Sequence, residues 1–326
     1  MQFQNFLLNF IIFVKMKAMT QVHFQIMSKN HTFLPYSSKS KWSAPFTFIQ
    51  AADTQYGMID ALKENTSSEY NWDKEIKLTE KAIEIANNLI PKPKFFIVCG
   101  DLVNAYPGER LKASQIASFK QTFSKLDPKI PLICVCGNHD VGNYPTSKDI
   151  QNYRKDFGDD YFSFWVGGVK FIALNSQYYF NDTHVKEYSQ EQDNWLKSEL
   201  KDGIDSNAQH VMLFQHIPWF LVEPNEEMAF YDETKKGSYN LKKELRLKML
   251  ELFRSYGVTK IFCGHYHRNG GGFYQDTLEI VITSAIGRQL GDDKSGFRLV
   301  KVYPDRITHK YLSFELFDPK DPFLKL

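Results

Sequence analysis

The chain has 326 residues, of which 43% are hydrophobic and 15% aromatic, a composition that favours a packed globular protein. The formal net charge is only +2. A nucleic-acid-binding protein usually has a larger basic excess or a basic stripe, so we expect no nucleic-acid partner.

The N-terminal region, residues 1–42, has no clear hydrophobic periodicity and is expected to be a poorly ordered extension of a single domain over 43–326. Its apolar run from Phe6 to Val14 is shorter than the about 20 residues that span a bilayer. No Lys or Arg precedes this run and no convincing small-residue cleavage site follows it. These features disfavour a signal peptide and stable membrane insertion, and we expect a cytoplasmic protein. The cysteines are interpreted as buried free thiols of a reducing compartment: Cys99, Cys134, Cys136 and Cys263.

Strand-like and helix-like segments alternate from Phe46 onward. Apolar residues at helical spacing predict helices over 72–90, 110–126 and 241–256. Short apolar runs that end in polar residues predict strands over 46–53, 94–101, 131–140, 210–218 and 258–267. A hairpin is expected to turn at Gly167 and Gly168, Ser189 and Gln192 form a capping-box pattern before a helix, and 273–314 alternates like β structure. This order predicts an α/β domain with sheets covered by helices.

Polar side chains follow each of these predicted strands at the point where the strand ends. They are Asp53 and Gln55; Asp101; Asn138, His139 and Asp140; His216; and His265 and His267. Ligand sites of open α/β sheets form outside the carboxyl ends of the strands, so we expect these side chains to meet at one edge.

The chemistry of this set predicts a metal site. Carboxylates, imidazoles and amide oxygens suit Mn, Mg, Fe or Zn, and the sequence does not determine which of these is bound. The set is too large for one tetrahedral ion and would hold two divalent ions about 3.5–4 Å apart, with one carboxylate bridging. Such a pair clamps the attacking and leaving oxygens of a displacement at phosphorus, which favours phosphate-ester hydrolysis.

The same residues resemble the motifs of the calcineurin-like metallophosphoesterases. The matching stretches are Asp53-x-Gln55, Gly100-Asp101, Gly137-Asn138-His139-Asp140, His216 and Gly264-His265-x-His267. A lone Gly-Asp means nothing, but these motifs in this order are very improbable by chance. Further segments, such as GDDYFSFWVGGVKFIALNSQ and GHYHRNGGGFYQ, resemble a branch of the family regarded as cytosolic protein Ser/Thr phosphatases. The resemblance covers about residues 42–313 and implies a four-layer αββα sandwich of two mixed β-sheets flanked by helices.

The resemblance also implies roles for individual residues. The first metal would be held by Asp53, Gln55, Asp101 and His267, and the second by Asp101, Asn138, His216 and His265, with Asp101 bridging. His139 would assist the leaving oxygen, and Asp140 would orient His139 by accepting its other ring N–H. Gln55 departs from the histidine that most of the superfamily has at this position, so the first site is expected to bind metal more loosely or to prefer Mn or Mg.

The substrate contacts are less clear from the sequence. The large phosphoprotein phosphatases have an Arg shortly after both the Gly-Asp and the Gly-Asn-His motifs, and neither Arg is present here. Asn104 and Arg268 are the tentative substrate-contacting residues in their place, and Arg268 is equally expected to face solvent. Trp219, Phe220 and Tyr231 follow His216 and would either wall the groove or pack in the core.

The expected function is a binuclear-metal phosphomonoesterase, a protein Ser/Thr phosphatase whose metal-bridging hydroxide attacks phosphoserine or phosphothreonine. Its partner would be a phosphoprotein substrate, and the sequence does not reveal an oligomeric state. One alternative is a phosphodiesterase acting on nucleotides or other small diesters. Another is a phosphoesterase fold that serves as a binding scaffold, although only Gln55 departs from the expected ligands.

Overall fold

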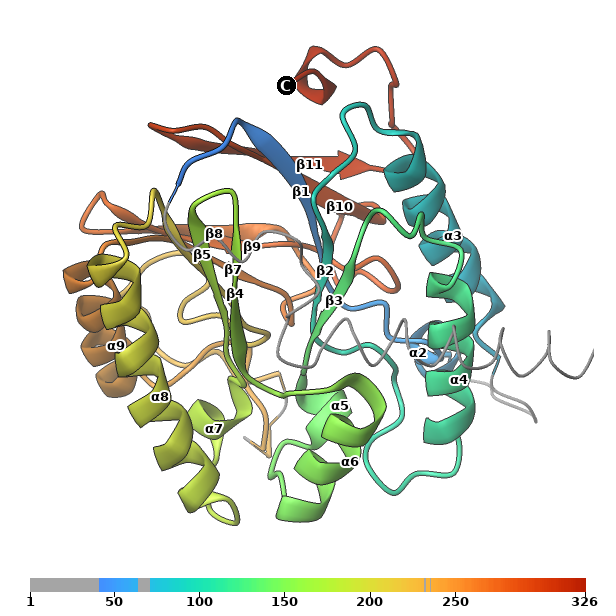
Figure 1. The fold of residues 1–326 in the computed structure, drawn as a ribbon. Coiled ribbons are helices and arrows are strands. Elements are labelled where there is room, and N and C mark those ends of the chain that lie inside the picture. Colours follow the sequence, from blue (N-terminus) through green and yellow to red (C-terminus); the bar gives the residue numbers. More distant parts are fainter. Residues whose placement is uncertain (1–40, 64–70, 232, 235) are drawn as a thin grey trace, which may run out of the picture.

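Two β-sheets lie face to face at the centre of the computed structural model, which describes residues 41–63, 71–231, 233–234 and 236–326 (Figure 1). The first sheet has the strand order β11 (Ile307–Ser313), β10 (Gly296–Val302), β1 (Phe46–Ala51), β2 (Phe96–Cys99) and β3 (Leu132–Val135). The second has the order β4 (Phe162–Val166), β5 (Val169–Ala173), β6 (Val211–Phe214), β7 (Val258–Cys263), β9 (Leu278–Ile282) and β8 (Gly270–Tyr274). Both sheets are mixed: β1, β2 and β3 pair in parallel, as do β5, β6, β7 and β9, whereas the pairs β1–β10, β10–β11, β4–β5 and β8–β9 are antiparallel.

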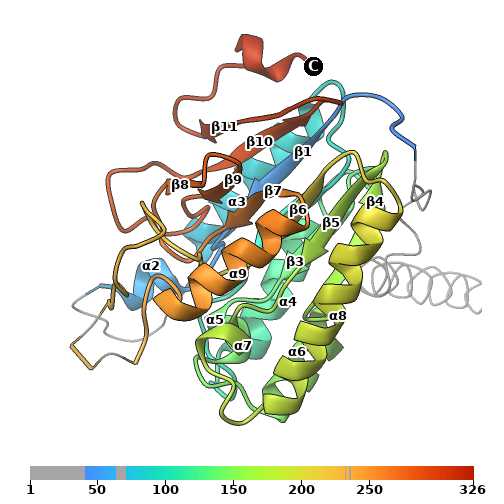
Figure 2. The same ribbon diagram turned by 90° about the vertical axis from the view of Figure 1, so that its left-hand side faces the viewer.

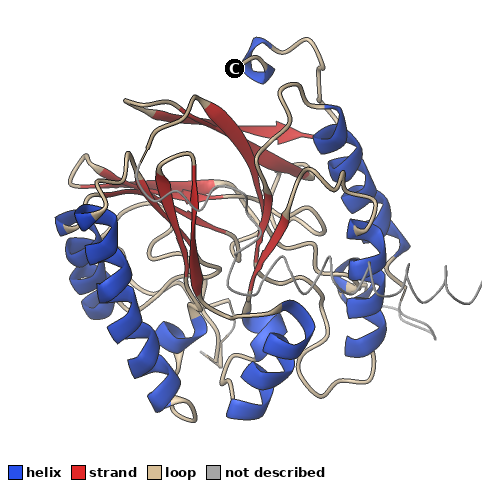
Figure 3. Ribbon diagram, viewed as in Figure 1, coloured by secondary structure: helices blue, strands red, loops and turns tan. Residues whose placement is uncertain are grey.

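Helices cover the outer faces of the two sheets. On the side of the first sheet lie α3 (Asp73–Asn88) and α4 (Lys112–Phe123), and on the side of the second lie α8 (Lys186–Asp205) and α9 (Lys243–Ser255), as Figures 2 and 3 show. The shorter helices are α2 (Met58–Ala61), α5 (Asn138–Val141), α6 (Ser147–Phe157), α7 (Gln177–Phe180) and the 3-10 turn η1 (Pro322–Leu324). This arrangement confirms the predicted αββα sandwich.

The alternation of apolar residues along the strands explains why the sheets stack. In β1, Phe46 and Phe48 point into the space between the sheets, whereas Ile49 and Ala51 pack beneath the helices of the first sheet. The space between the sheets is filled largely by aromatic rings, and Phe48 stacks on Phe95 with ring centroids 4.6 Å apart. Rings of this size bury enough apolar surface to hold two sheets together without disulfides.

Several local predictions are confirmed by the structure. The hairpin of β4 and β5 turns at Gly167 and Gly168, helices α3, α4 and α9 occupy the expected segments, and all four cysteines are buried free thiols. Trp42 packs on Phe46, with ring centroids 6.2 Å apart, and the rest of the expected extension lies outside the described residues, apart from Lys41. No helix in the described part of the chain is long and apolar enough to cross a membrane.

The predicted capping box at Ser189 is wrong. Helix α8 begins at Lys186 after Val185, so Ser189 lies inside the helix and not at its start. The side chain of Gln192 is used elsewhere: its Oε1 accepts the Asn175 N–H at 2.8 Å and its Nε2 donates to the Asn175 carbonyl at 3.2 Å. A tertiary contact between α8 and the end of β5 therefore takes the side chain that the local pattern assigned to a cap.

Candidate metal centre

The strand ends of both sheets bring the motif residues to one place, as predicted. Asp53, Asp101 and Asn138 follow β1, β2 and β3, whereas His216 and His265 follow β6 and β7. Backbone hydrogen bonds join neighbouring strand ends: Asp53 N–H donates to the Gly100 carbonyl at 3.1 Å, and Gly264 N–H donates to the His216 carbonyl at 3.1 Å. The two sheets thus supply opposite sides of a single buried cluster.

Glycine is required where a backbone passes close to this cluster. A Cβ at Gly100 would lie 2.3 Å from His216 Nδ1, and one at Gly137 would lie 2.3 Å from Asp101 Oδ1. Heavy atoms cannot approach that closely, so any other residue at either position would displace a candidate ligand. The Gly-Asp and Gly-Asn-His motifs therefore have a steric cause in this structure.

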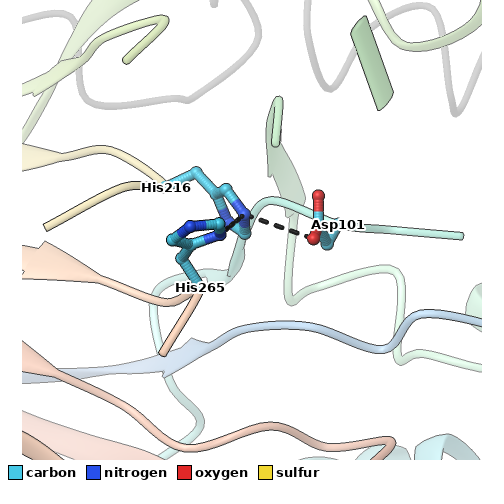
Figure 4. Close-up of side chains that lie close together, drawn as sticks. All are labelled: Asp101, His216 and His265. Atoms are coloured by element: carbon cyan, nitrogen blue, oxygen red, sulfur yellow. Dashed lines mark hydrogen bonds and ion pairs between the residues drawn. The ribbon is translucent and has the colours of Figure 1, made fainter. Parts of the chain in front are cut away.

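One group of candidate ligands, the set expected for the second ion, is centred on His216 (Figure 4). The ring nitrogen His216 Nε2 lies 3.0 Å from His265 Nδ1, 3.1 Å from Asn138 Oδ1 and 3.3 Å from Asp101 Oδ2. Ligands about 2.1 Å from one ion are separated by about 3.0–3.4 Å in octahedral or tetrahedral geometry. The spacing of these four side chains therefore fits a shared cation.

The other group, the set expected for the first ion, contains Asp53, Gln55 and His267, together with Asp101. Carboxylate oxygens of Asp53 and Asp101 and an imidazole nitrogen of His267 lie within 4.8 Å of one another, and Asp53 Oδ1 is 3.4 Å from His267 Nε2. Asp53 Oδ1 and Gln55 Oε1 are buried and have no hydrogen-bond partner among the residues that the structure describes. Burying such oxygens without a partner costs free energy, which a cation bound between them would offset. These two oxygens therefore fit a metal ligand role.

Backbone carbonyls fix which nitrogen of each imidazole faces the cluster. His216 Nδ1 lies 2.8 Å from the Cys99 carbonyl, His265 Nε2 lies 2.8 Å from the Ser238 carbonyl, and His267 Nδ1 contacts the Arg288 carbonyl. A nitrogen beside a carbonyl must be the protonated one, which leaves the lone pair of the other nitrogen toward the carboxylates. This tautomer pattern is the one that a metal-binding imidazole needs.

The charges of the cluster shift its pKa values. Burial disfavours the charged form of Asp101, yet the nearby His216 and His139 hold the Asp101 pKa well below its ordinary value. Burial also opposes the charge on His216, but Asp101 outweighs it and raises the His216 pKa to about 9. For His265, burial and the neighbouring His216 lower the pKa to about 3. A proton and a metal ion would compete for His216 Nε2, so metal binding at this nitrogen would release a proton.

His139 lies beside the cluster and is oriented by a residue other than the expected one. Its Nδ1 contacts the Asn104 carbonyl, and its Nε2 is 3.9 Å from Asp101 Oδ2. Burial lowers the His139 pKa, and the charge of Asp101 opposes this effect.

The expected role of Asp140 as the orienting partner of His139 is wrong in this structure. Asp140 Oδ2 accepts the Gly137 N–H at 2.8 Å, and Asp140 Oδ1 accepts the Leu102 N–H at 3.2 Å. Lys112 pairs with the same carboxylate at 4.0 Å and donates to the His139 carbonyl at 2.8 Å. Because Asp140 lies at the start of α5, it satisfies backbone groups there and ties two motif loops together.

The cluster forms the floor of a pocket of about 200 Å³. The metal-facing floor is defined here as the expected ligands, of which Asp53 and His216 are fully buried and the others line the pocket: Asp53, Gln55, Asp101, Asn138, His216, His265 and His267. The pocket wall is the set of apolar and aromatic side chains that line the same pocket: Met58, Leu62, Tyr106, Tyr231, Tyr239 and Leu290. The pocket is therefore polar at its base and largely apolar around its sides.

The two residues expected to touch substrate are not among the described side chains that line this pocket. Asn104 Oδ1 accepts a hydrogen bond from Gln55 Nε2 at 3.4 Å, which leaves Gln55 Oε1 for the cluster. Arg268 donates to the Leu290 carbonyl at 2.7 Å and its guanidinium lies over the Tyr266 ring. Of the aromatic residues after His216, Tyr231 lines the pocket, whereas Trp219 and Phe220 are fully buried in the core between α9 and the second sheet.

One buried arginine organises the loop that carries part of the wall. Arg246, on α9, donates to the carbonyls of Pro224, Glu226 and Leu241 at 2.6–3.0 Å. The same loop places the Ser238 carbonyl against His265. The sequence does not single out Arg246, because nothing in a basic helix surface distinguishes one buried guanidinium from its exposed neighbours.

A family profile described as "Calcineurin-like phosphoesterase" matches residues 46–269, which include every motif residue of the pocket. The chain belongs to this family. Among curated relatives, "Serine/threonine-protein phosphatase CPPED1" of Homo sapiens is 44% identical over 285 residues, covering 86% of this chain and 88% of the relative. The protein of the same name from Danio rerio is 40% identical over 302 residues, covering 92% and 95% of the two chains.

Solved structures support the fold. A dimetal phosphatase from Danio rerio superposes with a TM-score of 0.58 at 16% identity, covering 82% of this chain and 96% of that one. A purple acid phosphatase from yellow lupin gives a TM-score of 0.61 at 13% identity, covering 86% and 53%. Together with the shared Asp101, the family assignment supports a site for two divalent metal ions.

Proposed function

We propose that this protein is a two-metal phosphomonoesterase that removes phosphate from phosphoserine and phosphothreonine in proteins. The observation that carries the proposal is the position of Asp101, which belongs to both groups of potential metal ligands. A carboxylate common to two cation sites is the arrangement that two-metal hydrolysis of phosphate esters uses. The relatives named serine/threonine-protein phosphatase, similar over most of their length, support phosphoproteins as the substrate class.

The residues fall into two proposed ligand sets. Asp53, Gln55, Asp101 and His267 would hold the first ion. Asp101, Asn138, His216 and His265 would hold the second. When bound, the two ions would acidify water and neutralise charge on the phosphoryl oxygens.

The chain itself contributes the handling of the leaving group. Because His139 Nδ1 contacts the Asn104 carbonyl, its Nε2 is the nitrogen left for the pocket. In the protonated imidazole, Nε2 would donate its proton to the oxygen of the departing serine or threonine. Asp140 and Lys112 hold the backbone around His139 and thereby fix where the ring stands.

Manganese is the proposed metal and the cytoplasm the proposed location. The floor offers carboxylate, amide and imidazole ligands, a mixture that suits Mn²⁺, and the neutral Gln55 amide is a harder ligand than histidine. All four cysteines are buried free thiols, which is consistent with a reducing compartment. We also propose that the domain comprises residues 43–326, preceded by a poorly ordered extension over 1–42.

Phosphate release from a phosphothreonine peptide tests the proposal directly. The protein is purified with Mn²⁺, and Asp101→Asn incubated with the same peptide gives the background. We expect release well above that background. Release from a nucleotide diester, with none from the phosphopeptide, would favour a phosphodiesterase. No release from either ester and no bound metal would favour a binding scaffold.

A further inference from the structure

Tyr106 connects the candidate leaving-group residue with a candidate metal ligand. It lies in the loop between β2 and α4 and lines the pocket. Its ring lies against the His139 imidazole, with centroids 4.1 Å apart and planes inclined by 32°. Its hydroxyl oxygen accepts a hydrogen bond from Asn138 Nδ2 at 3.2 Å. A single side chain therefore contacts two consecutive motif residues at the edge of the floor.

The hydrogen bonds of this hydroxyl leave its proton available. Asn138 turns Oδ1 toward His216, so its Nδ2 is the donor that faces Tyr106. A phenolic group has one proton and two acceptor lone pairs, so an oxygen that accepts from the Asn138 amide still has its proton to donate.

The described part of the pocket lacks the lysines and arginines that usually bind phosphate. Among the described residues that line it, none is Lys or Arg, and Arg268 is turned toward Leu290 and Tyr266. A phosphoryl group has oxygens that need hydrogen-bond donors in addition to metal ions. In this pocket, neutral donors at the wall are the groups available for that purpose.

We propose that Tyr106 contacts the substrate, donating its hydroxyl hydrogen bond to a phosphoryl oxygen beside His139. The inference rests on the proposed phosphomonoesterase function. Tyr106 takes the part that an arginine clamp plays in the large phosphoprotein phosphatases. The ring contact with His139 places the hydroxyl on the side of the pocket where the leaving oxygen departs.

Tyr106→Phe tests this contact, because it removes the hydroxyl and keeps the ring against His139. The matched control is Tyr303→Phe, in the turn between β10 and β11 at the opposite end of the first sheet from the floor. Kinetics with a phosphothreonine peptide are combined with calorimetric titration of the Mn²⁺-loaded protein with inorganic phosphate. Bound metal is measured by elemental analysis, and folding by thermal unfolding.

We expect Tyr106→Phe to lower kcat/KM by about 10- to 100-fold, the effect of losing one hydrogen bond to a charged oxygen. Phosphate binding should weaken in the same variant, with metal content and unfolding temperature unchanged, and Tyr303→Phe should match the wild-type protein. Wild-type phosphate binding in Tyr106→Phe would overturn the proposal. Loss of a metal ion together with activity would also overturn it, because the hydroxyl would then act through Asn138 on the metal.

The phosphate titration separates this inference from the proposed function. If the wild-type protein hydrolyses no phosphomonoester, the function fails. Weaker phosphate binding by Tyr106→Phe would still support the contact, and unchanged binding would refute it.

Discussion

The metal-facing floor and the pocket wall are built on different principles. Floor residues lie at the carboxyl ends of strands from both sheets, and their imidazoles are held by backbone carbonyls such as those of Cys99 and Ser238. Wall residues come from loops and short helices, and they present rings and aliphatic chains. The floor thus takes its precision from the sheets, whereas the wall depends on separate loop contacts. We therefore expect changes at the floor to abolish chemistry and changes at the wall to alter substrate binding.

The largest effect is expected for Asp101→Asn, the floor residue common to both ligand groups. Its activity on a phosphothreonine peptide should fall by about 10³-fold or more, because the loss of a shared carboxylate weakens charge stabilisation at both ions. Elemental analysis should show that occupancy falls at both metal sites. His267→Asn should lower the occupancy of one site only. A variant Asp101→Asn with two tightly bound ions would show that the carboxylate is not shared.

His139→Ala separates leaving-group assistance from metal binding. We expect metal content and fold to be retained. Activity on a phosphothreonine peptide should fall by about 10²- to 10³-fold, because a poor leaving group needs a proton. Hydrolysis of an activated aryl phosphate should fall much less. Equal losses on both substrates would exclude His139 as the proton donor.

Arg246→Met tests the dependence of the wall on its loop contacts. The substitution leaves the carbonyls of Pro224, Glu226 and Leu241 without their donor, so the free energy of unfolding should fall by about 2–4 kcal/mol. KM for the phosphopeptide should rise by about 10-fold, since Tyr231 and Tyr239 lose their fixed positions.

Arg254→Met on the same helix is the matched control for Arg246→Met, because among the described residues the Arg254 guanidinium donates only to the half-exposed Glu251 on its own helix turn. It should leave KM unchanged. If Arg246→Met changed kcat and metal content and left KM unaltered, the loop that Arg246 holds would position the metal ligands of the floor. The proposed difference between floor and wall would then be wrong.

The smallest functional effect is expected for Glu279→Gln in β9, outside both regions. Burial opposes the charge of Glu279, but His309 and Lys260 outweigh it and lower the pKa from 4.5 to about 2. A lowered pKa in the folded protein stabilises the fold above pH 4.5, and this contribution is lost as the pH falls toward 2. The variant should be less stable than the wild-type protein by about 1–3 kcal/mol at pH 7, with normal kcat/KM.

Urea unfolding at pH 7 and pH 3 would measure this difference, which should be smaller at pH 3. The control is Glu315→Gln, which removes an exposed ion pair with Lys294 and should change stability little at either pH. If the difference in unfolding free energy between Glu279→Gln and the wild-type protein were not smaller at pH 3 than at pH 7, this would contradict an ionised Glu279 that pairs with Lys260 and His309. A loss of activity in Glu279→Gln would mean that a change in β9 alters the geometry of the floor.

The sequence predicts the floor well because each of its residues is placed by the end of a strand that a short stretch of the chain indicates. Apolar runs that end in Asp53, Asp101 and His216 indicate both a strand and the edge at which that strand stops. The Gly before Asp101 and the Gly before Asn138 are visible in the sequence as parts of these motifs, although the contacts that require them are tertiary, with His216 and with Asp101 respectively. Fold class and the meeting of the motif residues therefore follow from short stretches of the chain.

The pocket wall and the contacts that support the site could not be predicted from the sequence, since they depend on tertiary contacts. Nothing near Tyr106 in the sequence indicates that its ring lies against His139. Asp140 is next to His139 in the chain, yet its carboxylate satisfies the backbone at Gly137 and Leu102, and a distant carbonyl orients the ring. Likewise, the Gln192 side chain hydrogen-bonds to Asn175, whereas the local sequence pattern assigned it to a helix cap.

The backbone conformation of the floor restricts which amino acids can replace its residues. Asp53, Gln55, Asp101, His265 and His267 all have positive φ angles, between 39° and 69°. Asn, Asp and His tolerate this left-handed region, and glycine adopts it freely, whereas alanine and larger or branched side chains are strained there. An alanine scan of these positions would therefore mix lost chemistry with lost stability. Asparagine at 101, 265 or 267 would remove a ligand and keep the backbone conformation, so the activity lost in these variants would report lost chemistry and not lost stability.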